Sequence, residues 1–400
     1  MEEFIDSDEN KNVALKINIE ESTEGRKKFN QKYNYNKINS IEISNNKSSD
    51  ITFNKIDLSN SNISQNPISL LTYNFFCRPP PIKTNKSDYK DARLLDFFQQ
   101  LENYDIICFQ ELFTTLNDRK HKMIQEGSRQ GLKYYLTAKV PSFFSRYLID
   151  SGLLILSRYR IIDHDFYEYY MNISGDAPSN KGVLYAKIEI KKHLFLFLFN
   201  THLQSSYFDD KPENIDTTIQ IRTKQTEELI NFIYNKILTI PEKEILNGKI
   251  ILCGDFNIDA HDNVFAQQRY NNIPKYKYTE YEILNQKLNK LGQAIDLMKK
   301  KYNKHLYTFG DNSKIEYDKV LTGKADYNLK QCLDYIWEII PDYNLDIYNE
   351  IKEDDNNKNI IKDKIEVLYD TLKVEEFLVK NKPYQQLSDH FGISVHLAYS

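Results

Sequence analysis

The feature that most constrains how this 400-residue chain folds is a series of short, largely apolar runs. Several of these runs contain one conspicuous polar side chain or end at one. Runs of roughly four to eight apolar residues are typical of buried strands. Patterns with apolar residues three and four positions apart lie between these runs and favour helices. We therefore predict a domain that mixes strands and helices. The expected strands are Ile68–Phe76, Ile106–Phe109, Leu153–Leu156, Val183–Ile190, Leu194–Asn200, Ile250–Cys253, Cys332–Ile339 and Ile393–Leu397.

Three helices and one hairpin complete this outline. The expected helices are Asp91–Leu101, Ile221–Leu238 and Glu280–Lys301. The two strands on either side of Lys191–His193 have the spacing of an antiparallel hairpin. A mixed sheet is therefore expected, and not a pure repeat of parallel strands.

Residues 1–66 differ in composition from the rest of the chain. Between Asn30 and Asn66, 17 of 37 residues are Asn or Ser, and no periodic apolar face is sustained. Such a segment buries too little apolar surface to offset its chain entropy, which predicts a mostly disordered tail. Residues 67–400 then form one domain with polar insertions near 302–327 and 341–382. The second insertion carries two expected helices, Ile361–Lys373 and Glu375–Val379.

Composition disfavours several classes of protein. The longest uninterrupted apolar run has six residues, whereas a membrane-spanning helix needs roughly 20. The acidic N-terminus lacks the apolar stretch of a secretory signal. Four cysteines lie in or beside apolar runs without a CxxC pair, which favours buried reduced thiols and a cytoplasmic location. A net charge of −4 disfavours a globally basic nucleic-acid binder.

Polar side chains gather at the ends of the expected strands. An isolated buried charge is very costly, so such groups must be paired or used in the protein's chemistry. One carboxylate after a strand is usually an ordinary loop residue, but six strands with such a group favour a site. The residues concerned are Asn74, Glu111, His202, Asp255, Asn257, Asp334, Asp389 and His390.

The residue types in this set point to phosphoester hydrolysis. Carboxylate and amide oxygens suit Mg²⁺, or Mn²⁺ as the alternative, because both take octahedral oxygen coordination. Histidines that titrate near neutral pH serve as general base and acid. Hydrolysis of a phosphoester needs a cation on the phosphoryl oxygen and an activated water opposite the leaving group.

The ordered series TYN, QE, NTH, GDFN, LDYIW and SDH resembles the endonuclease/exonuclease/phosphatase superfamily. The resemblance runs from Ile68 nearly to the C-terminus. It implies an α+β fold, a deoxyribonuclease-like four-layer α/β sandwich of two mixed sheets packed face to face and flanked by helices. It also implies that Glu111 binds the cation with Asn74 beside it. Asp255 and Asn257 match the pair that orients the attacking water and the phosphate.

The resemblance assigns the remaining polar residues to acid–base chemistry. His390 matches the general base, and Asp389 is the carboxylate next to it. Asp334 matches the carboxylate that orients a histidine, and it should hold the His390 imidazole in one tautomer. His202 matches the second histidine, which stabilises charge on the phosphoryl oxygen or assists the leaving group.

A more specific resemblance is to neutral sphingomyelinases. It rests on the Asn-containing strand that runs into Arg-Pro-Pro, and on SGLLILSRY, KGVLYAKI, NTHLQSSY and PYQQLSDHFGI. The loop GDAPSNKG places Asp176 five residues before Lys181, as in the loop that controls access to the site in that family. Lys181 offers a positive charge for a phosphodiester, and Asp176 either pairs with it or releases it. The alternative is a surface ion pair that contributes little.

These resemblances imply a Mg²⁺-dependent hydrolase of phospholipase C type that cleaves sphingomyelin to ceramide and phosphocholine, with His390 as general base. Its expected partner is sphingolipid in a membrane surface, met by peripheral contact. No transmembrane segment and no protein partner are predicted, and nucleic acid is disfavoured. The segment Pro141–Phe144 fits either a lipid contact or a loop packed on the core.

Inositol-phosphate sphingolipids are a close variant of the proposed substrate. Three other functions compete with this interpretation. A nuclease of the same fold would need a basic groove. An inositol-polyphosphate phosphatase resembles the fold, but it carries a Pro-Ala-Trp-Cys-Asp-Arg type of motif where this chain reads CLDYIWEI. A non-catalytic scaffold has no reason to keep the whole set of catalytic groups.

Overall fold

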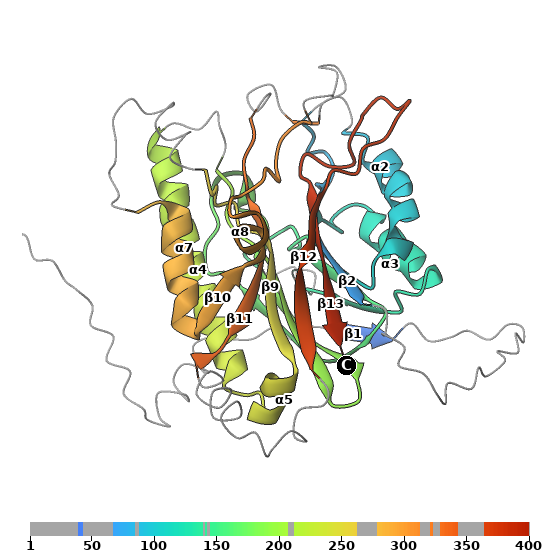
Figure 1. Ribbon diagram of the computed structural model, residues 1–400. Helices are drawn as coiled ribbons and strands as arrows, with labels where there is room; N and C mark the ends of the chain where they lie inside the picture. The colour runs from blue at the N-terminus through green and yellow to red at the C-terminus, as the bar shows by residue number, and fades with distance from the viewer. Residues whose placement is uncertain are drawn as a thin grey trace, which may run out of the picture. The chain divides into compact units, whose positions relative to one another are not determined.

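Two mixed β-sheets face each other in the computed structural model (Figure 1). The structure describes residues 39–42, 67–84, 88–138, 141, 145–206, 212–261, 278–312, 321–322, 329–342 and 364–399. Except for a four-residue strand, the expected Asn/Ser-rich tail lies outside the described residues, and so does the segment Ser142–Phe144.

The first sheet has seven strands, of which β2 and β3 are parallel and the other neighbours antiparallel. In spatial order they are β1 (Asn39–Glu42), β4 (Tyr134–Thr137), β5 (Leu154–Ser157), β3 (Ile106–Leu112), β2 (Ile68–Cys77), β13 (Gly392–Tyr399) and β12 (Ile365–Glu375). Strand β1 falls inside the stretch expected to be disordered, and its backbone pairs with β4.

The second sheet has six strands, and only β8 and β9 run parallel among its neighbours. In spatial order they are β10 (Gln293–Asp296), β11 (Asp334–Ile340), β9 (Lys249–Asp255), β8 (Leu194–His202), β7 (Gly182–Lys191) and β6 (Arg160–Glu168). Strands β7 and β8 form the expected hairpin.

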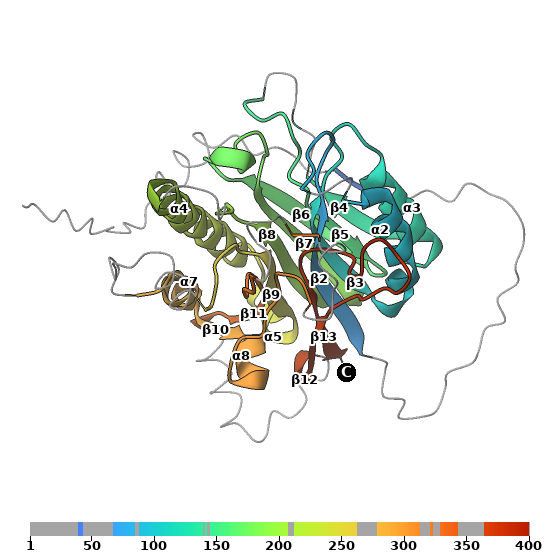
Figure 2. The ribbon, with the colours of Figure 1, turned by 90° about the horizontal axis from the view of Figure 1, so that it is seen from above.

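Helices cover the outer faces of both sheets, which makes four layers (Figure 2). Helices α2 (Lys90–Phe97) and α3 (Arg119–Arg129) lie on the first sheet, and α2 continues into the 3₁₀ helix η1 (Phe98–Asn103). On the side of the second sheet lie α4 (Pro212–Ile237), α5 (Glu242–Asn247), α7 (Glu280–Leu288) and α8 (Leu297–Tyr302). The predicted four-layer sandwich is therefore confirmed.

Aromatic and aliphatic side chains fill both interfaces of the sandwich. Between the sheets, Leu70 and Cys108 belong to the same buried cluster as Leu198 and Leu252 of the facing sheet. Under α2, the rings of Phe75, Phe97 and Phe109 pack edge to face with centroids 5.2 to 5.9 Å apart. Burial of this much apolar surface is the main force that holds the layers together.

Strand direction brings the six polar motifs to one end of the sandwich. Strands β2, β3, β8 and β9 present their carboxyl ends there, because each parallel pair points the same way. Strands β11 and β13 start at this end, since they run antiparallel to β9 and β2. Asp334, the first residue of β11, is the register partner of Asp255, the last residue of β9.

Three helix predictions were wrong. The expected helix over Glu280–Lys301 is broken after α7, because Gly292 takes a φ of 127°. The chain then forms β10, and Asp296 caps α8 by accepting from the backbone N–H groups of Met298 and Lys299. A second expected helix, Ile361–Lys373, lies partly outside the described residues, and from Ile365 onward the chain is strand β12. No helix forms over Glu375–Val379.

The two stretches interpreted as insertions also contribute to the fold. Strand β12 comes from the second one and pairs with β13. Phe309, from the first, forms isolated backbone bridges to Gln331 and His390. Residues 313–320, 323–328 and 343–363 lie outside the part of the chain that the structure describes.

Candidate active site

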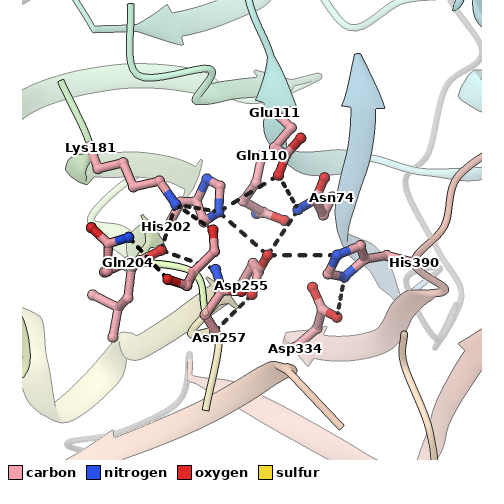
Figure 3. A network of polar contacts seen from close by, with 12 residues as sticks. Asn74, Gln110, Glu111, Lys181, His202, Gln204, Asp255, Asn257, Asp334 and His390 are labelled. Atoms are coloured by element: carbon pink, nitrogen blue, oxygen red, sulfur yellow. Dashed lines mark hydrogen bonds and ion pairs between the residues drawn. The ribbon is translucent and has the colours of Figure 1, made fainter. Parts of the chain in front are cut away.

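Polar side chains from both sheets converge at this end of the sandwich (Figure 3). Asn74 and Glu111 come from the first sheet, His202 and Asp255 from the second, and His390 from the loop before β13. All of them except Glu111 are almost fully buried as residues. The structure therefore brings together residues that are up to 316 positions apart in the sequence.

Asn74 joins the two carboxylates at the centre of the site. Its Nδ2 lies 2.8 Å from Asp255 Oδ2 and 3.4 Å from Glu111 Oε1. Its Oδ1 accepts from the backbone N–H of Phe76, 3.0 Å away. In this arrangement Asn74 faces the carboxylates through its amide nitrogen, and its role as a cation ligand stays a prediction.

His390 forms the predicted pair with Asp334. The distance from His390 Nδ1 to Asp334 Oδ2 is 2.8 Å, and Nε2 lies 3.8 Å from Asp255 Oδ2. Burial alone would lower the pKa of His390, but Asp334 and Asp255 outweigh it and raise that pKa to about 10. The pair fixes the Nδ1 side of the ring and leaves Nε2 pointing at the centre of the site.

Asp255 takes a central place between the two histidines. His202 Nε2 lies 3.5 Å from Asp255 Oδ2, on the opposite side from His390. Burial, and after it the charge of Asp334, raises the pKa of Asp255 to about 6. The other oxygen, Oδ1, accepts from the backbone N–H of Asn257 at 2.8 Å, which shapes the turn after β9. Asn257 adopts a φ of 52° there, and its side chain donates to Leu203 O.

Lys181 reaches the site from the loop that the sequence singled out. Its Nζ lies 2.7 Å from Asp176 Oδ2, 3.0 Å from His202 Nε2 and 2.7 Å from Leu203 O. The side chain is 1% exposed, so the alternative of a surface ion pair is wrong. Burial, together with the charges of Lys181 and His390, holds the pKa of His202 well below its usual range. His202 is therefore neutral, and the positive charge beside it is on Lys181.

Asp389 directly precedes the proposed base in the chain and is 6% exposed. Among the described residues its carboxylate accepts from Ser388 Oγ, 3.3 Å away. Burial raises the pKa of Asp389 to about 7. Ser388 also donates to Asn74 O at 2.7 Å, so this loop is tied to β2.

Sequence reasoning missed several residues that shape the site. Gln204 and Ser205 donate to Asp176 Oδ2 at 2.8 to 3.0 Å, and their position in NTHLQSSY was a usable signal. Buried Arg93 donates to the carbonyls of Phe75, Phe76 and Leu387, and so links β2 to the His390 loop. No sequence signal marked Arg93 as part of the site, because its partners are backbone atoms.

Two groups of atoms have the chemistry to hold a divalent cation. Ligand atoms of Asp255, Asp334 and His390 lie within 4.8 Å of one another. However, Asp334 and His390 already form a hydrogen bond with each other. A protonated His390 imidazole would also repel a cation. Glu111, by contrast, has a buried Oε2 with no hydrogen-bond partner among the described residues. This orphaned oxygen, with Asp255 on the other side of Asn74, fits a hard cation better.

Comparisons with known proteins show which family this chain is similar to. The profile of the endonuclease/exonuclease/phosphatase family matches residues 71–275. A sphingomyelinase of Dictyostelium discoideum is 28% identical over 365 residues, which cover 79% of this chain and 76% of that protein. A sphingomyelinase C of Bacillus cereus is 26% identical over 48% of this chain and 58% of that protein.

Solved structures show the same fold at low sequence identity. Sphingomyelinase C from Streptomyces griseocarneus superposes with a TM-score of 0.53 at 16% identity, covering 82% of this chain and 99% of that chain. The protein SmcL gives a TM-score of 0.51 at 19% identity, covering 83% and 99%. Since the family profile spans just over half of the 400 residues and the fold agrees, the chain belongs to the endonuclease/exonuclease/phosphatase family.

Proposed function

We propose that this protein is a Mg²⁺-dependent phosphodiesterase that hydrolyses sphingomyelin to ceramide and phosphocholine. The observation that carries the proposal is the convergence of the His390–Asp334 pair, Asp255, and Glu111 with its unpartnered oxygen on one buried centre. Supporting it, the curated relatives described above are named sphingomyelinases. A structure of Staphylococcus aureus beta toxin, 21% identical, is described with bound magnesium ions.

The cation is assigned to Glu111, with Asn74 and Asp255 around it. A divalent cation held there supplies charge to polarise the phosphoryl oxygen and to offset the buried carboxylates. Glu111 contributes its free Oε2, and Asn74 fixes the distance between Glu111 and Asp255 through its two hydrogen bonds. Mg²⁺ suits the oxygen-rich set, and Mn²⁺ is the alternative.

His390 is assigned as the general base. Its Nε2 faces the centre of the site, while Asp334 holds Nδ1 at 2.8 Å. A base must be unprotonated before it accepts a proton from water. Asp334 and Asp255 are the charges that contribute most to raising the pKa of His390 to about 10. A cation held beside Asp255 would offset part of this charge, lower that pKa and leave Nε2 able to accept a proton from water.

His202, Lys181 and Asn257 are assigned to the phosphoryl group. Charge develops on the phosphoryl oxygens in the transition state, and preorganised donors in a buried site stabilise it strongly. Lys181 supplies the positive charge and lies 3.0 Å from the neutral ring of His202. Asp176 holds Lys181 at 2.7 Å, so the position of this loop sets how much of that charge faces the substrate.

Contact with a membrane surface is proposed from exposed apolar side chains near this end. Leu116 follows β3 and is 80% exposed, and Leu148 precedes β5 and is 77% exposed. Single exposed apolar residues are ordinary, but residues on neighbouring loops at the catalytic end suit a lipid surface. None of the helices in the described ranges combines the length and the apolarity needed to cross a bilayer. Four free, buried cysteines suit the proposed cytoplasmic location.

A substrate panel tests the proposed function. The purified protein is incubated with sphingomyelin, with an inositol-phosphate ceramide and with supercoiled plasmid DNA, each with Mg²⁺ or with EDTA. We expect Mg²⁺-dependent release of phosphocholine from sphingomyelin and no nicking of the plasmid. Cleavage of the inositol lipid alone would replace the choline headgroup in the proposal, and plasmid nicking alone would favour a nuclease.

Cosedimentation with sphingomyelin vesicles tests the proposed membrane contact. Leu116→Asp should lower vesicle binding. Leu238→Asp, which changes an exposed leucine just after α4, is the control and should not lower it.

A further inference from the structure

Asp150 is a buried acceptor of several hydrogen bonds. It is not among the residues that the sequence motifs assigned to the site. It lies in the loop between β4 and β5 and is 1% exposed. Its Oδ1 accepts from the backbone N–H groups of Thr114 and Thr115 at 2.7 and 3.2 Å. Its Oδ2 pairs with Lys120 Nζ at 2.5 Å and accepts from Gly152 N at 3.3 Å. Lys120 is 3% exposed, so both partners of the pair are inside the protein.

The backbone groups that Asp150 binds flank Glu111. Glu111 has a φ of 53°, a left-handed conformation that is costly for a residue with a side chain. Thr114 and Thr115 follow it in the chain, and Gly152 lies across from it, where Gly152 O accepts from Leu112 N at 2.9 Å. A Cβ atom on Gly152 would lie 3.1 Å from both the N and the Cα of Glu111. Asp150 thus binds the chain just after the strained residue and the segment that lies across from it.

The carboxylate of Glu111 has few contacts of its own to fix it. Among the described residues, its nearest polar neighbours are Asn74 Nδ2 at 3.4 Å and His202 Nε2 at 4.0 Å, and Oε2 has no hydrogen-bond partner. Its place therefore depends on the backbone that carries it. A conformation with a cost persists only where its surroundings impose it, and the hydrogen bonds to Asp150 are part of those surroundings.

The same loop continues toward Lys181. The backbone N–H groups of Leu148 and Ile149 donate to Pro178 O, and Asn180 N donates to Ile149 O at 3.1 Å. Ser179 Oγ contacts Asp150 O at 3.4 Å. The segment around Asp150 is thus bonded both to the strand end that carries Glu111 and to the residues that precede Lys181.

We propose that Asp150 is a positioning residue for the cation site: with Lys120 it holds the backbone of Glu111 in the left-handed conformation that points the carboxylate at Asn74. It touches neither substrate nor cation. The inference rests on the proposed function, because it takes Glu111 as the cation ligand. Replacing a residue that orients a metal ligand typically lowers metal affinity by about 10- to 100-fold.

The test is Mg²⁺ binding to the full chain without substrate, measured by isothermal titration calorimetry. Asp150→Asn removes the charge that pairs with Lys120, and Gly152→Ala presses a methyl group against the Glu111 backbone. Each variant should raise the Kd for Mg²⁺ by about 10-fold or more. Each variant should also raise the Mg²⁺ concentration that gives half-maximal activity. Its kcat at saturating Mg²⁺ should change far less.

Matched controls separate positioning from general destabilisation. Glu338→Gln breaks the ion pair between Lys249 Nζ and Glu338 Oε1, which lie 2.6 Å apart. This buried pair lies toward the end of β9 and β11 that is opposite the site. Gly292→Ala strains a glycine with a φ of 127° before β10. Both should lower the melting temperature and leave the Kd for Mg²⁺ unchanged. If Asp150→Asn does not fold, Gly152→Ala with its own control decides the question.

Glu111→Gln in the same titration distinguishes the two claims. Suppose that Glu111→Gln raises the Kd for Mg²⁺, while folded Asp150→Asn and Gly152→Ala keep the wild-type Kd. This result would overturn the positioning role alone. A wild-type Kd in Glu111→Gln would overturn the cation assignment and the positioning role with it. Equal weakening by the control variants would show a loss of stability in place of positioning, and would also overturn it.

Discussion

His390 and Asp334 form a buried hydrogen bond of 2.8 Å between the imidazole Nδ1 and Oδ2; His390 lies in the loop before β13, and Asp334 is the first residue of β11. The bond fixes which nitrogen faces the site, and Asp334 is the charge that contributes most to raising the pKa of His390. The pair thus sets both the direction and the proton affinity of the proposed base.

Replacing Asp334 with Asn should separate these two effects. We expect kcat to fall by about 10²- to 10⁴-fold, because the base loses its orienting carboxylate. The acid limb of the kcat/KM profile should also move to lower pH, since removing the negative charge lowers the pKa of His390. Initial rates between pH 5 and 9 measure both.

The matched control for this variant is Asp296→Asn. Asp296 Oδ2 and His305 Nε2 form a similar contact of 2.8 Å outside the proposed site. That variant should change stability and leave the pH profile in place. An Asp334→Asn enzyme with an unshifted acid limb would contradict the proposed role of the carboxylate.

Lys181→Met should remove the positive charge beside His202. Loss of one preorganised donor to the developing charge costs about 10²- to 10³-fold in kcat. The pKa of His202 should rise at the same time, because Lys181 helps to hold it down. NMR of the imidazole signals reports that pKa, and steady-state kinetics reports kcat. Lys187→Met, in strand β7 just after Lys181, breaks a 2.6 Å pair with Glu244 of helix α5; it is the control and should keep wild-type kcat.

Mg²⁺ should stabilise the folded protein through Glu111. A ligand that binds only the folded state adds about 2.7 kcal/mol at 100 times its Kd. The melting temperature of the wild-type protein should therefore rise with added Mg²⁺ and fall back with EDTA. Glu111→Gln should abolish the rise, whereas Glu126→Gln, on helix α3, should keep it. An equal shift in Glu111→Gln would place the cation elsewhere.

Asp389 should make the metal-free protein less stable as pH rises. Its pKa is about 7 in the folded state and about 3.9 in an unfolded chain. A carboxyl with a raised folded pKa contributes stability below the unfolded pKa and loses it as pH rises through the folded pKa. Between pH 4 and 7 the wild-type free energy of unfolding should fall by roughly 2 to 4 kcal/mol more than that of Asp389→Asn. Urea unfolding in EDTA measures it, and parallel pH curves would refute it.

Much of the site could be predicted because its residues stand at strand ends. A buried strand is recognisable by its apolar run, and a carboxylate or imidazole at its end has few ordinary explanations. The order of the motifs then implied which of them meet. Arg93 and Asp150 carried no such signal, because they act on backbone atoms brought together only by the fold.

The wrong helix predictions have two different physical causes. The segment that forms β12 contains Glu and Leu, which favour helices locally, and pairing with β13 overrides that preference. Its alternation of buried Ile365 and Val367 with exposed Glu366 was the contrary signal. In the stretch 280–301, the break depends on one glycine conformation and one cap, neither of which alters the apolar spacing.

The central claim is that His390 activates water in metal-dependent cleavage of sphingomyelin. The most direct test is phosphocholine release from sphingomyelin in mixed micelles by wild-type protein, His390→Ala and His121→Ala, each with Mg²⁺ and with EDTA. His121 lies on α3, where its ring contacts the exposed Gln125 at 2.8 Å, and it serves as the control. We predict release by wild type and His121→Ala only with Mg²⁺, and a rate at least about 10³-fold lower for folded His390→Ala. Release that persists in EDTA, or a folded His390→Ala protein with near wild-type activity, would contradict the claim.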